Sequence, residues 1–363
     1  MKRISTASSV LEELLGEGDK PYESTDFSAD KKVVVVQKAT KGKGINMVLL
    51  GDGFSDRLIA DGTYESVMMK GIEAFFNIQP YTYFRDYFNI YYVNAVSVQE
   101  GCGRGMNTVF TTVFGDGTSV EGNNYTCMDY ARLCGFTDDE MNEVLIITMM
   151  NSTRYAGTCV MFRGPHYLGD YGRGMSISYF PIGNNDKDLE QVLHHEAGGH
   201  GFSKLLDEYY YDKAIYQGDI DTYLMLRESY GWGKNVDYVS SPTEVYWSKF
   251  ITDPRYKQEN IGVYEGAATY MYGAYRPTDY SIMRYNTGGF NAPSREAIYY
   301  RIHKLAYGEE WEYDFEEFVK WDQVYGMPSF TGSTVSRSID PEKRTAPPVI
   351  IDGYWANGRL ILE

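Results

Sequence analysis

Basic residues are in short supply in this chain. Lysine and arginine together number 34 among 363 residues, against 50 aspartates and glutamates, which leaves a formal net charge of −16 at pH 7. A protein that binds nucleic acid neutralises phosphates with a basic footprint, and a strongly acidic chain opposes that role. The composition therefore predicts no nucleic-acid partner, although it does not say which partner the chain has.

Long apolar runs are also missing. The sequence has no stretch of about 18 consecutive apolar residues, the length that a membrane-spanning helix needs, so we expect no membrane span. The chain begins with Met1 and the two basic residues Lys2 and Arg3, but no apolar core follows them, so this segment is not a signal peptide as it stands. A mature chain that had lost its signal peptide would look the same.

Cysteine is sparse, and its spacing forms no recognisable pair. The four cysteines (Cys102, Cys127, Cys134 and Cys159) show no C-x-x-C spacing, which excludes a zinc knuckle of the usual kind. One or two disulfides and free buried thiols are both compatible with this spacing. Cysteine usage therefore does not decide the compartment.

Histidine is scarce as well, yet it is concentrated in one place. The chain has only five histidines, and His194, His195 and His200 all fall within residues 192–209. Histidine beside an acid is the commonest way to hold a catalytic zinc. The order His195-Glu196-…-His200 is that of a zincin helix, in which two imidazoles hold the metal and the glutamate acts on the attacking water.

The spacing of the two histidines departs from the standard motif. A zincin helix carries its ligands at i and i+4, about 40° apart, whereas His195 and His200 stand at i and i+5, about 140° apart on a regular helix. A π-bulge absorbs one extra residue and brings i and i+5 to the same side, and such bulges favour functional sites. The alternative makes Glu196 and His200, at i and i+4, the ligand pair and removes Glu196 from catalysis. We favour the bulge, for which residues 197–199 (Ala-Gly-Gly) offer a flexible place.

The flanking residues favour metal binding over a purely structural histidine pair. Asn185 or Asp186 can cap the helix, and Leu189, Val192 and Leu193 supply a buried face. Two adjacent glycines cost a helix interior roughly 2 kcal/mol relative to alanine. A purely structural helix would have little reason to carry them.

A third ligand is expected a short distance downstream. An open catalytic zinc needs three protein ligands and a water, and Asp207 follows His200 after an apolar turn. We assign Asp207 to the third place. The adjacent Glu208 is either the ligand in its stead or a hydrogen-bond partner that orients an imidazole.

Four segments together resemble a known family. Residues 195–209, H-E-A-G-G-H-G-F-S-K-L-L-D-E-Y, resemble the active-site segment of the IgA-peptidase-like family of zinc metallopeptidases, which reads H-E-x-G-H, an apolar turn and D-E-Y. Residues 46–54 resemble that family's early G-D-G-F strand and turn, and residues 80–90 resemble its segment that begins P-Y and ends F-N-V. Residues 281–285, Ser-Ile-Met-Arg-Tyr, resemble the Met-turn of metzincins in the form seen in astacins.

The resemblance implies a fold and roles for two further residues. The fold it implies is α/β (α+β): a metzincin-like zincin with a twisted mixed sheet, an active-site helix and a Met-turn. In that fold Met283 forms an apolar floor under the zinc without binding it, and Tyr285 corresponds to a tyrosine that can donate to the oxyanion. The chain departs from the family pattern at the extra glycine and at Ser203, where metzincins usually place glycine.

The function that the resemblance implies is zinc-dependent cleavage of peptide bonds in proteins. His195, His200 and Asp207 hold Zn2+, and Glu196 takes a proton from the attacking water and later delivers it to the leaving amine. The expected partner is a protein or peptide substrate, and the expected location is secreted, cell-surface or periplasmic. The alternative is a catalytically inactive zincin-like module that binds protein or glycan. Specificity and oligomeric state stay open.

Three parts of the chain are expected to differ in role. Residues 1–30 form an N-terminal extension, residues 31–325 a zinc metallopeptidase domain, and residues 326–363 a C-terminal extension. Within the domain, the upper part reaches to residue 200 and the lower part carries the Met-turn.

Periodicity predicts elements around the histidine motif. A long amphipathic helix is expected over residues 55–78, and strands are expected over residues 33–36, 45–50, 87–97, 143–150 and 175–180. The metzincin-like fold that the resemblance implies places the last of these strands at the sheet edge beside the cleft, where a substrate peptide can pair with it. Asp52, His166 and His303 are expected to be structural or surface residues.

Overall fold

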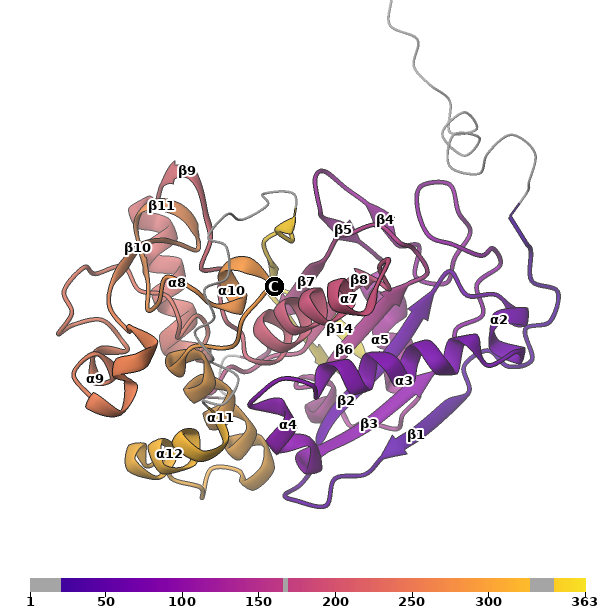
Figure 1. Ribbon diagram of the computed structural model, residues 1–363. Coiled ribbons are helices and arrows are strands. Elements are labelled where there is room, and N and C mark those ends of the chain that lie inside the picture. The colour runs from indigo at the N-terminus through magenta and orange to yellow at the C-terminus, as the bar shows by residue number, and fades with distance from the viewer. Residues whose placement is uncertain (1–20, 166–168, 327–342) are drawn as a thin grey trace, which may run out of the picture.

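A seven-stranded sheet forms the centre of the computed structural model, which describes residues 21–165, 169–326 and 343–363 (Figure 1). In spatial order its strands are β1 (Val33–Gln37), β3 (Phe88–Val93), β2 (Ile45–Asp52), β6 (Leu145–Met150), β8 (Ser176–Pro181), β7 (Thr158–Phe162) and β12 (Val349–Ile351). The four strands β3, β2, β6 and β8 are parallel, whereas β1 and β7 run antiparallel to their neighbours β3 and β8. The sheet is therefore mixed, in agreement with the expected α/β class.

Helices cover both faces of this sheet. Every residue of β2 and β6 is buried, and alternate residues of β2 pack into two different cores. Met47 and Leu49 face α3 (Thr63–Phe75) and α7 (Asp186–Leu193), and Val48 and Leu50 face α5 (Asn124–Arg132). Because successive side chains of a strand point to opposite faces, near-continuous apolar strands suit a sheet that is covered twice.

The predicted long helix over residues 55–78 is wrong. The structure has two helices there, α2 (Asp56–Ala60) and α3, separated at Gly62. Gly62 adopts the left-handed conformation (φ 85°) that glycine reaches without a steric penalty, and it caps the start of α3. The amphipathic pattern continued across this break, so periodicity alone did not reveal it.

The predicted place of the strand over residues 175–180 is also wrong. That strand is β8, and it lies inside the sheet between β6 and β7. Beyond β7, the outer place belongs to β12, which comes from the C-terminal part of the chain and runs parallel to β7. A peptide therefore has no free edge on β8.

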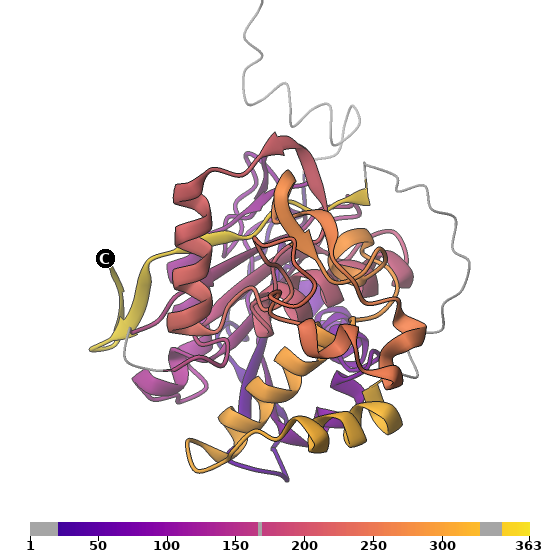
Figure 2. The same cartoon turned by 90° about the vertical axis from the view of Figure 1, so that its left-hand side faces the viewer.

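A second region follows residue 202 and lies beside the sheet (Figures 1 and 2). Its three-stranded sheet has the order β10-β11-β9, with β10 at Tyr264–Ala267, β11 at Thr269–Arg276 and β9 at Tyr210–Ala214. Its helices are α8 (Gln217–Tyr230), α9 (Ser248–Ile251), η3 (Pro254–Glu259), α10 (Ile282–Tyr285), α11 (Ala292–Tyr307), α12 (Phe315–Trp321) and η4 (Asp322–Gly326).

The other described elements are short. They are α4 (Tyr81–Phe84), η1 (Arg85–Tyr87), α6 (Asp138–Met141), β4 (Val113–Phe114), β5 (Val120–Glu121), β13 (Gly353–Ala356) and β14 (Arg359–Leu362). All four cysteines are free thiols. Within the described ranges, no helix combines the length and apolarity needed to cross a membrane.

Candidate metal centre

The histidine motif lies on a π-helix. Helix α7 is capped by Asn185, whose side chain accepts a hydrogen bond from the backbone N–H of Asp188 (2.9 Å), and it continues into the π-helix η2 (His194–Phe202). Near its end, the N–H of Ser203 donates to the carbonyl of Gly198, five residues earlier (3.2 Å). The expected π-bulge is confirmed and is longer than one residue. Because a π-helix closes its turns over five residues, it brings i and i+5 to the same side.

Close packing explains the two adjacent glycines of η2. A Cβ atom on Gly199 would lie 2.2 Å from the Sδ of Met283, and one on Gly198 would lie 3.1 Å from the Tyr81 ring. Met283 and Tyr81 are both buried. The glycines therefore let α10 and α4 approach the π-helix closely, a role that the sequence pattern did not indicate.

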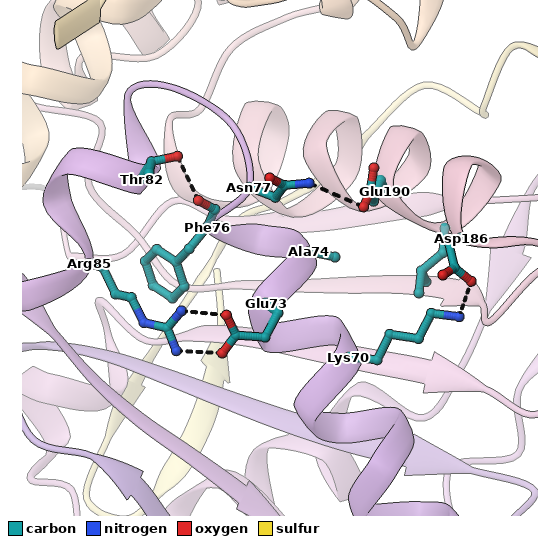
Figure 3. Close-up of a pocket in the computed structure, with 10 residues that line it drawn as sticks. Lys70, Glu73, Ala74, Phe76, Asn77, Thr82, Arg85, Asp186 and Glu190 are labelled. Atoms are coloured by element: carbon teal, nitrogen blue, oxygen red, sulfur yellow. Dashed lines mark hydrogen bonds and ion pairs between the residues drawn. The ribbon is translucent and has the colours of Figure 1, made fainter.

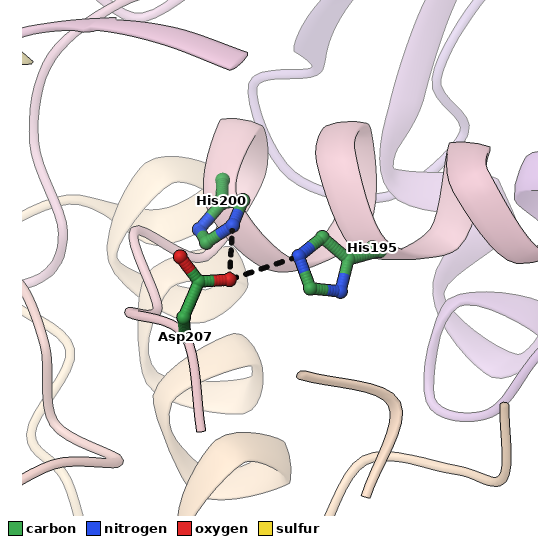
Figure 4. A group of neighbouring side chains, drawn as sticks. All are labelled: His195, His200 and Asp207. Atoms are coloured by element: carbon green, nitrogen blue, oxygen red, sulfur yellow. Dashed lines mark hydrogen bonds and ion pairs between the residues drawn. The ribbon is translucent and has the colours of Figure 1, made fainter. Parts of the chain in front are cut away.

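Three side chains converge below the π-helix (Figure 4). The Nε2 atoms of His195 and His200 lie 3.1 and 3.2 Å from the same Oδ1 atom of Asp207. The potential ligand atoms of the three residues all lie within 4.8 Å of one another, and each residue is at most 1% exposed. We refer to His195, His200 and Asp207 as the cluster.

Backbone carbonyls orient both imidazoles. His195 Nδ1 lies 3.0 Å from the carbonyl of Ile282, and His200 Nδ1 lies 2.7 Å from the carbonyl of Leu205. A carbonyl only accepts hydrogen bonds, so each Nδ1 carries the proton and each Nε2 presents its lone pair to Asp207 in the neutral ring. Three acceptor atoms thus converge, and such a set is held together by protons or by a metal cation. Two imidazole nitrogens and one carboxylate oxygen fit an open zinc site.

Asp207 and Glu208 are adjacent but have different surroundings. Burial acts to raise the pKa of Asp207, but the two imidazoles beside its carboxylate, His200 foremost, outweigh burial and lower the pKa below its usual value. Glu208 lies outside the cluster, and burial raises its pKa. Its carboxylate accepts hydrogen bonds from the side chains of Asn235, Ser281 and Asn291 at 2.6–3.1 Å.

Among the described residues Glu208 therefore takes neither of the two roles that the sequence left open, a ligand in place of Asp207 or a hydrogen-bond partner of an imidazole. The two carbonyls of Ile282 and Leu205 take that place, and a backbone carbonyl leaves no trace in a sequence. Glu208 instead ties the chain after Asp207 to the start of α10 through Ser281 and to the N-cap of α11 through Asn291.

Glu196 is fully buried and poorly hydrogen-bonded. In regular hydrogen-bond geometry neither of its carboxylate oxygens has a partner among the described residues, and the Thr345 hydroxyl and the Cys159 backbone lie only close enough to lower its pKa in part. Burial raises the pKa of Glu196 to about 7. Among the described residues, the group of converging ligand atoms contains His195 and not Glu196. The geometry therefore favours His195 and His200 as the ligand pair over Glu196 and His200.

The segment that resembles a Met-turn lies against the π-helix. Met283 of α10 is fully buried against Gly199, and its carbonyl accepts a hydrogen bond from the Glu208 N–H (2.9 Å). Tyr285 is half-buried, and its ring packs on Tyr280 (centroids 5.3 Å apart) and on the Arg284 guanidinium. The described hydrogen bonds do not connect the Tyr285 hydroxyl to the cluster, so its catalytic role stays a prediction.

Ser203, which stands where metzincins usually place glycine, closes the π-helix. Its hydroxyl lies 2.8 Å from the carbonyl of Gly198 and 2.6 Å from the hydroxyl of Tyr81. The Tyr81 hydroxyl donates to the same Gly198 carbonyl (2.6 Å). Together with the Ser203 N–H, the two hydroxyls direct three donors at the Gly198 carbonyl at the end of the π-helix.

The remaining candidates have structural surroundings or lie outside the description. Asp52 is buried and accepts hydrogen bonds from the side chains or N–H groups of Ser97, Thr108, Phe110 and Thr112. His303 packs on aromatic rings of α11 and its neighbours, and its Nδ1 lies 2.8 Å from the Tyr299 carbonyl. His166 lies outside the described residues.

A separate pocket of about 380 Å3 lies between α3 and α7 (Figure 3). Four of its five charged side chains form ion pairs, Lys70 with Asp186 at 2.5 Å and Arg85 with Glu73 at 2.6 Å, and the fifth, Glu190, accepts a hydrogen bond from the Asn77 amide (3.3 Å). The pocket contains none of the cluster residues, so it offers no alternative centre for the chemistry.

Comparison with known protein families gives a match. A family model described as IgA Peptidase M64 matches residues 33–256, more than half of the chain and a range that includes the cluster. No curated protein matches the chain.

Proposed function

The chain belongs to the IgA peptidase M64 family, and from this we propose that it is a zinc-dependent endopeptidase of metzincin-like fold that hydrolyses peptide bonds in protein substrates. The family implies a metallopeptidase. The observation that supports the finer proposal is the convergence of two imidazole nitrogens and one carboxylate oxygen beside Glu196, whose buried carboxylate has no partner in regular hydrogen-bond geometry among the described residues.

In this proposal the cluster holds the metal. His195, His200 and Asp207 are the ligands, and the Ile282 and Leu205 carbonyls keep both Nε2 atoms directed at one point. When bound there, a zinc ion supplies Lewis-acid activation of a water and of the scissile carbonyl. Met283 packs beneath the π-helix as the methionine of a Met-turn and does not bind the metal.

Glu196 is the proposed general base. It follows His195 directly on the π-helix, and burial raises its pKa to about 7. A group with that pKa can take a proton from the attacking water and later deliver it to the leaving amine near neutral pH. Tyr285 is the proposed donor to the oxyanion.

Several wider features belong to the same proposal. The peptidase domain spans residues 31–325, with extensions before and after it. We propose that the enzyme acts outside the cytoplasm, as a secreted, cell-surface or periplasmic protein. The proposed partner is a protein or peptide substrate.

Zinc content and casein cleavage, measured side by side, test the proposal. We expect the wild type to carry one zinc per chain and to cleave casein, and Glu196→Ala to keep its zinc and lose about 10²- to 10⁴-fold in rate, because general acid–base catalysis contributes that much. Glu190→Ala, a carboxylate removed from the adjacent helix α7, is the matched control and should keep full activity.

Two other outcomes have distinct meanings. Loss of zinc from Glu196→Ala would make Glu196 a ligand and contradict its role as base. A wild type that binds no zinc and cleaves nothing would contradict the enzyme and leave an inactive zincin-like module that binds protein or glycan.

A further inference from the structure

A C-terminal segment crosses the molecule beside the cluster. Residues 343–346 (Lys-Arg-Thr-Ala), here called the strap, lead into β12 and lie between the sheet region and the second region (Figure 1). The buried side chain of this segment is that of Thr345, which is 0% exposed.

Groups from the sheet region hold one side of the strap. The Thr118 hydroxyl donates to the Arg344 carbonyl (2.7 Å), and the Ala346 N–H donates to the Gly157 carbonyl (3.1 Å). Gly157 comes directly before β7, so the strap extends the pairing of β12 with β7 towards the cluster.

Groups from the second region hold the other side. The Tyr209 hydroxyl donates to the Thr345 carbonyl (2.9 Å), and the Asn286 amide donates to the Lys343 carbonyl (3.2 Å). Asn286 directly follows α10. The strap therefore bridges the two regions, and the cluster lies where these regions meet.

Two observations place the strap directly against the candidate catalytic residues. The position of a Cβ on Gly157 would be 3.0 Å from both the Glu196 Cγ and the Thr345 Cγ2, so this glycine makes room for both side chains. The Tyr209 ring that holds Thr345 also stacks on His195, with centroids 6.5 Å apart and an interplanar angle of 19°. A substrate at the cluster would have to occupy the same space.

Most of the hydrogen bonds that hold the strap involve its main chain, and its side chains add an ion pair from Lys343 to Asp188 (3.0 Å) and a hydrogen bond from Arg344 to the Tyr210 carbonyl (3.1 Å). The contacts described above involve three strap carbonyls and one N–H, and the Tyr155 hydroxyl adds a second donor to the Lys343 carbonyl (3.0 Å). Main-chain hydrogen bonds do not depend on the side chains of the bound segment, which is how a sheet edge accepts peptides of different sequence.

We propose that the strap occupies the peptide-binding groove of this protein, so that Thr118, Gly157, Tyr209 and Asn286 bind the main chain of an extended substrate once the strap has left. This inference rests on the proposed function for the identity of the ligand as a substrate. The full burial of the cluster and of Glu196 agrees with it, because a catalytic metal needs an open position that substrate can reach.

Two substitutions in the full chain loosen the strap without touching the cluster. Ala346→Pro removes the N–H that donates to Gly157, whereas Ala346→Gly keeps this N–H and is the matched control. Lys343→Glu reverses the charge that pairs with Asp188 at 3.0 Å, and Lys187→Glu makes the same charge change at an exposed neighbour of Asp188 outside the strap.

The binding measurement uses proteins that cannot turn over. All variants carry Glu196→Gln, are loaded with zinc, and are titrated into a fluorescein-labelled peptide of residues 343–348 (Lys-Arg-Thr-Ala-Pro-Pro), with anisotropy as the readout. If the strap fills the groove in nine molecules of ten, only one molecule in ten can bind the labelled peptide. Loosening the strap therefore raises the apparent affinity for this peptide about tenfold. We expect that gain for Ala346→Pro and Lys343→Glu, and no gain for the two controls. Thermal melting identifies a variant that has lost its fold.

Casein cleavage by the same variants with Glu196 restored separates this inference from the proposed function. Faster cleavage by both strap variants than by both controls supports the groove. Cleavage and peptide affinity that are equal in all proteins overturn the groove and leave the peptidase standing. Tighter peptide binding without cleavage in any protein retains the groove and contradicts the peptidase.

Discussion

Two buried glutamates, one before and one after Asp207 in the sequence, have very different surroundings. Glu196 lies on the π-helix and has no partner in regular hydrogen-bond geometry among the described residues, whereas Glu208 lies at the junction with α10 and α11 and accepts hydrogen bonds from three side chains. Both are fully buried, and burial raises the pKa of both. Burial alone therefore does not distinguish a reactive carboxylate from a structural one. The hydrogen-bond partners do, because a buried polar group without them reduces stability and is kept for another reason.

Replacing each glutamate in turn by alanine should produce the largest difference in the free energy of unfolding. Glu208→Ala leaves donors of Asn235, Ser281 and Asn291 buried without an acceptor, at about 1–3 kcal/mol each, so we expect a loss of about 4 kcal/mol in the free energy of unfolding. Both losses are compared near pH 5, where burial keeps Glu196 protonated in the folded protein, and there we expect Glu196→Ala to change the free energy of unfolding by no more than about 1 kcal/mol. Urea denaturation of the metal-free proteins measures both, and equal losses would contradict the comparison.

The second prediction concerns the pH dependence of stability, which isolates the contribution of Glu196. The folded-state pKa of Glu196 is raised from 4.5 to about 7, so its contribution to stability is present below pH 4.5 and is lost as the pH rises through 7. At about 1.4 kcal/mol per pKa unit, the metal-free wild type should lose about 3 kcal/mol from this group between pH 4.5 and 8. Glu196→Gln should lack this loss, while the Glu208 contribution cancels between the two proteins. Parallel stability curves for the two proteins would contradict the expectation.

The packing of Met283 joins the surroundings of Glu196 to those of Glu208. Disturbing this packing should have the smallest effect on stability. Met283 packs on Gly199 of the π-helix, and its carbonyl accepts a hydrogen bond from the Glu208 N–H. Gly199→Ala places a methyl group 2.2 Å from the Met283 Sδ, and we expect a loss of about 2 kcal/mol in unfolding free energy from overpacking.

A control and a double variant sharpen the Gly199 experiment. Gly218 lies in the first turn of α8, where an added Cβ meets no atom within 4 Å, so Gly218→Ala should be neutral or slightly stabilising. In a Met283→Ala background the loss caused by Gly199→Ala should disappear. If the loss persists there, the π-helix and not the packing requires glycine.

The sequence predicted what depends on local patterns. The strands β1, β2 and β6 lie at the predicted places, because apolar periodicity records which residues a sheet buries. The π conformation followed from the i, i+5 spacing of His195 and His200, since any shared site must bring them to the same side. The helix over residues 55–78 was wrong because its amphipathic pattern ran through Gly62, whose left-handed conformation breaks it.

What the sequence missed depends on tertiary contacts. The Ile282 carbonyl reaches His195 from 87 residues away, and the Thr345 carbonyl meets Tyr209 from 136 residues away. Backbone atoms carry no residue-specific signal, so no spacing rule could point to them. Glu208 was given two possible roles, ligand or partner of an imidazole, for the same reason: its partners Asn235, Ser281 and Asn291 are distant in sequence, and only Ser281 belonged to a motif, the segment that resembles a Met-turn.

The late position of the strap in the sequence has a consequence for the newly made chain. Tyr209 and Thr345 are 136 residues apart, and a ribosome that adds roughly 5–20 residues per second needs on the order of ten seconds to cover that distance. During this interval the strand β7 has been synthesised without β12, so its outer edge is an unpaired strand, the kind of surface that other chains can join. The order of translation thus leaves the nascent protein with an unpaired β7 edge and an uncovered cluster until the strap and β12 have been synthesised.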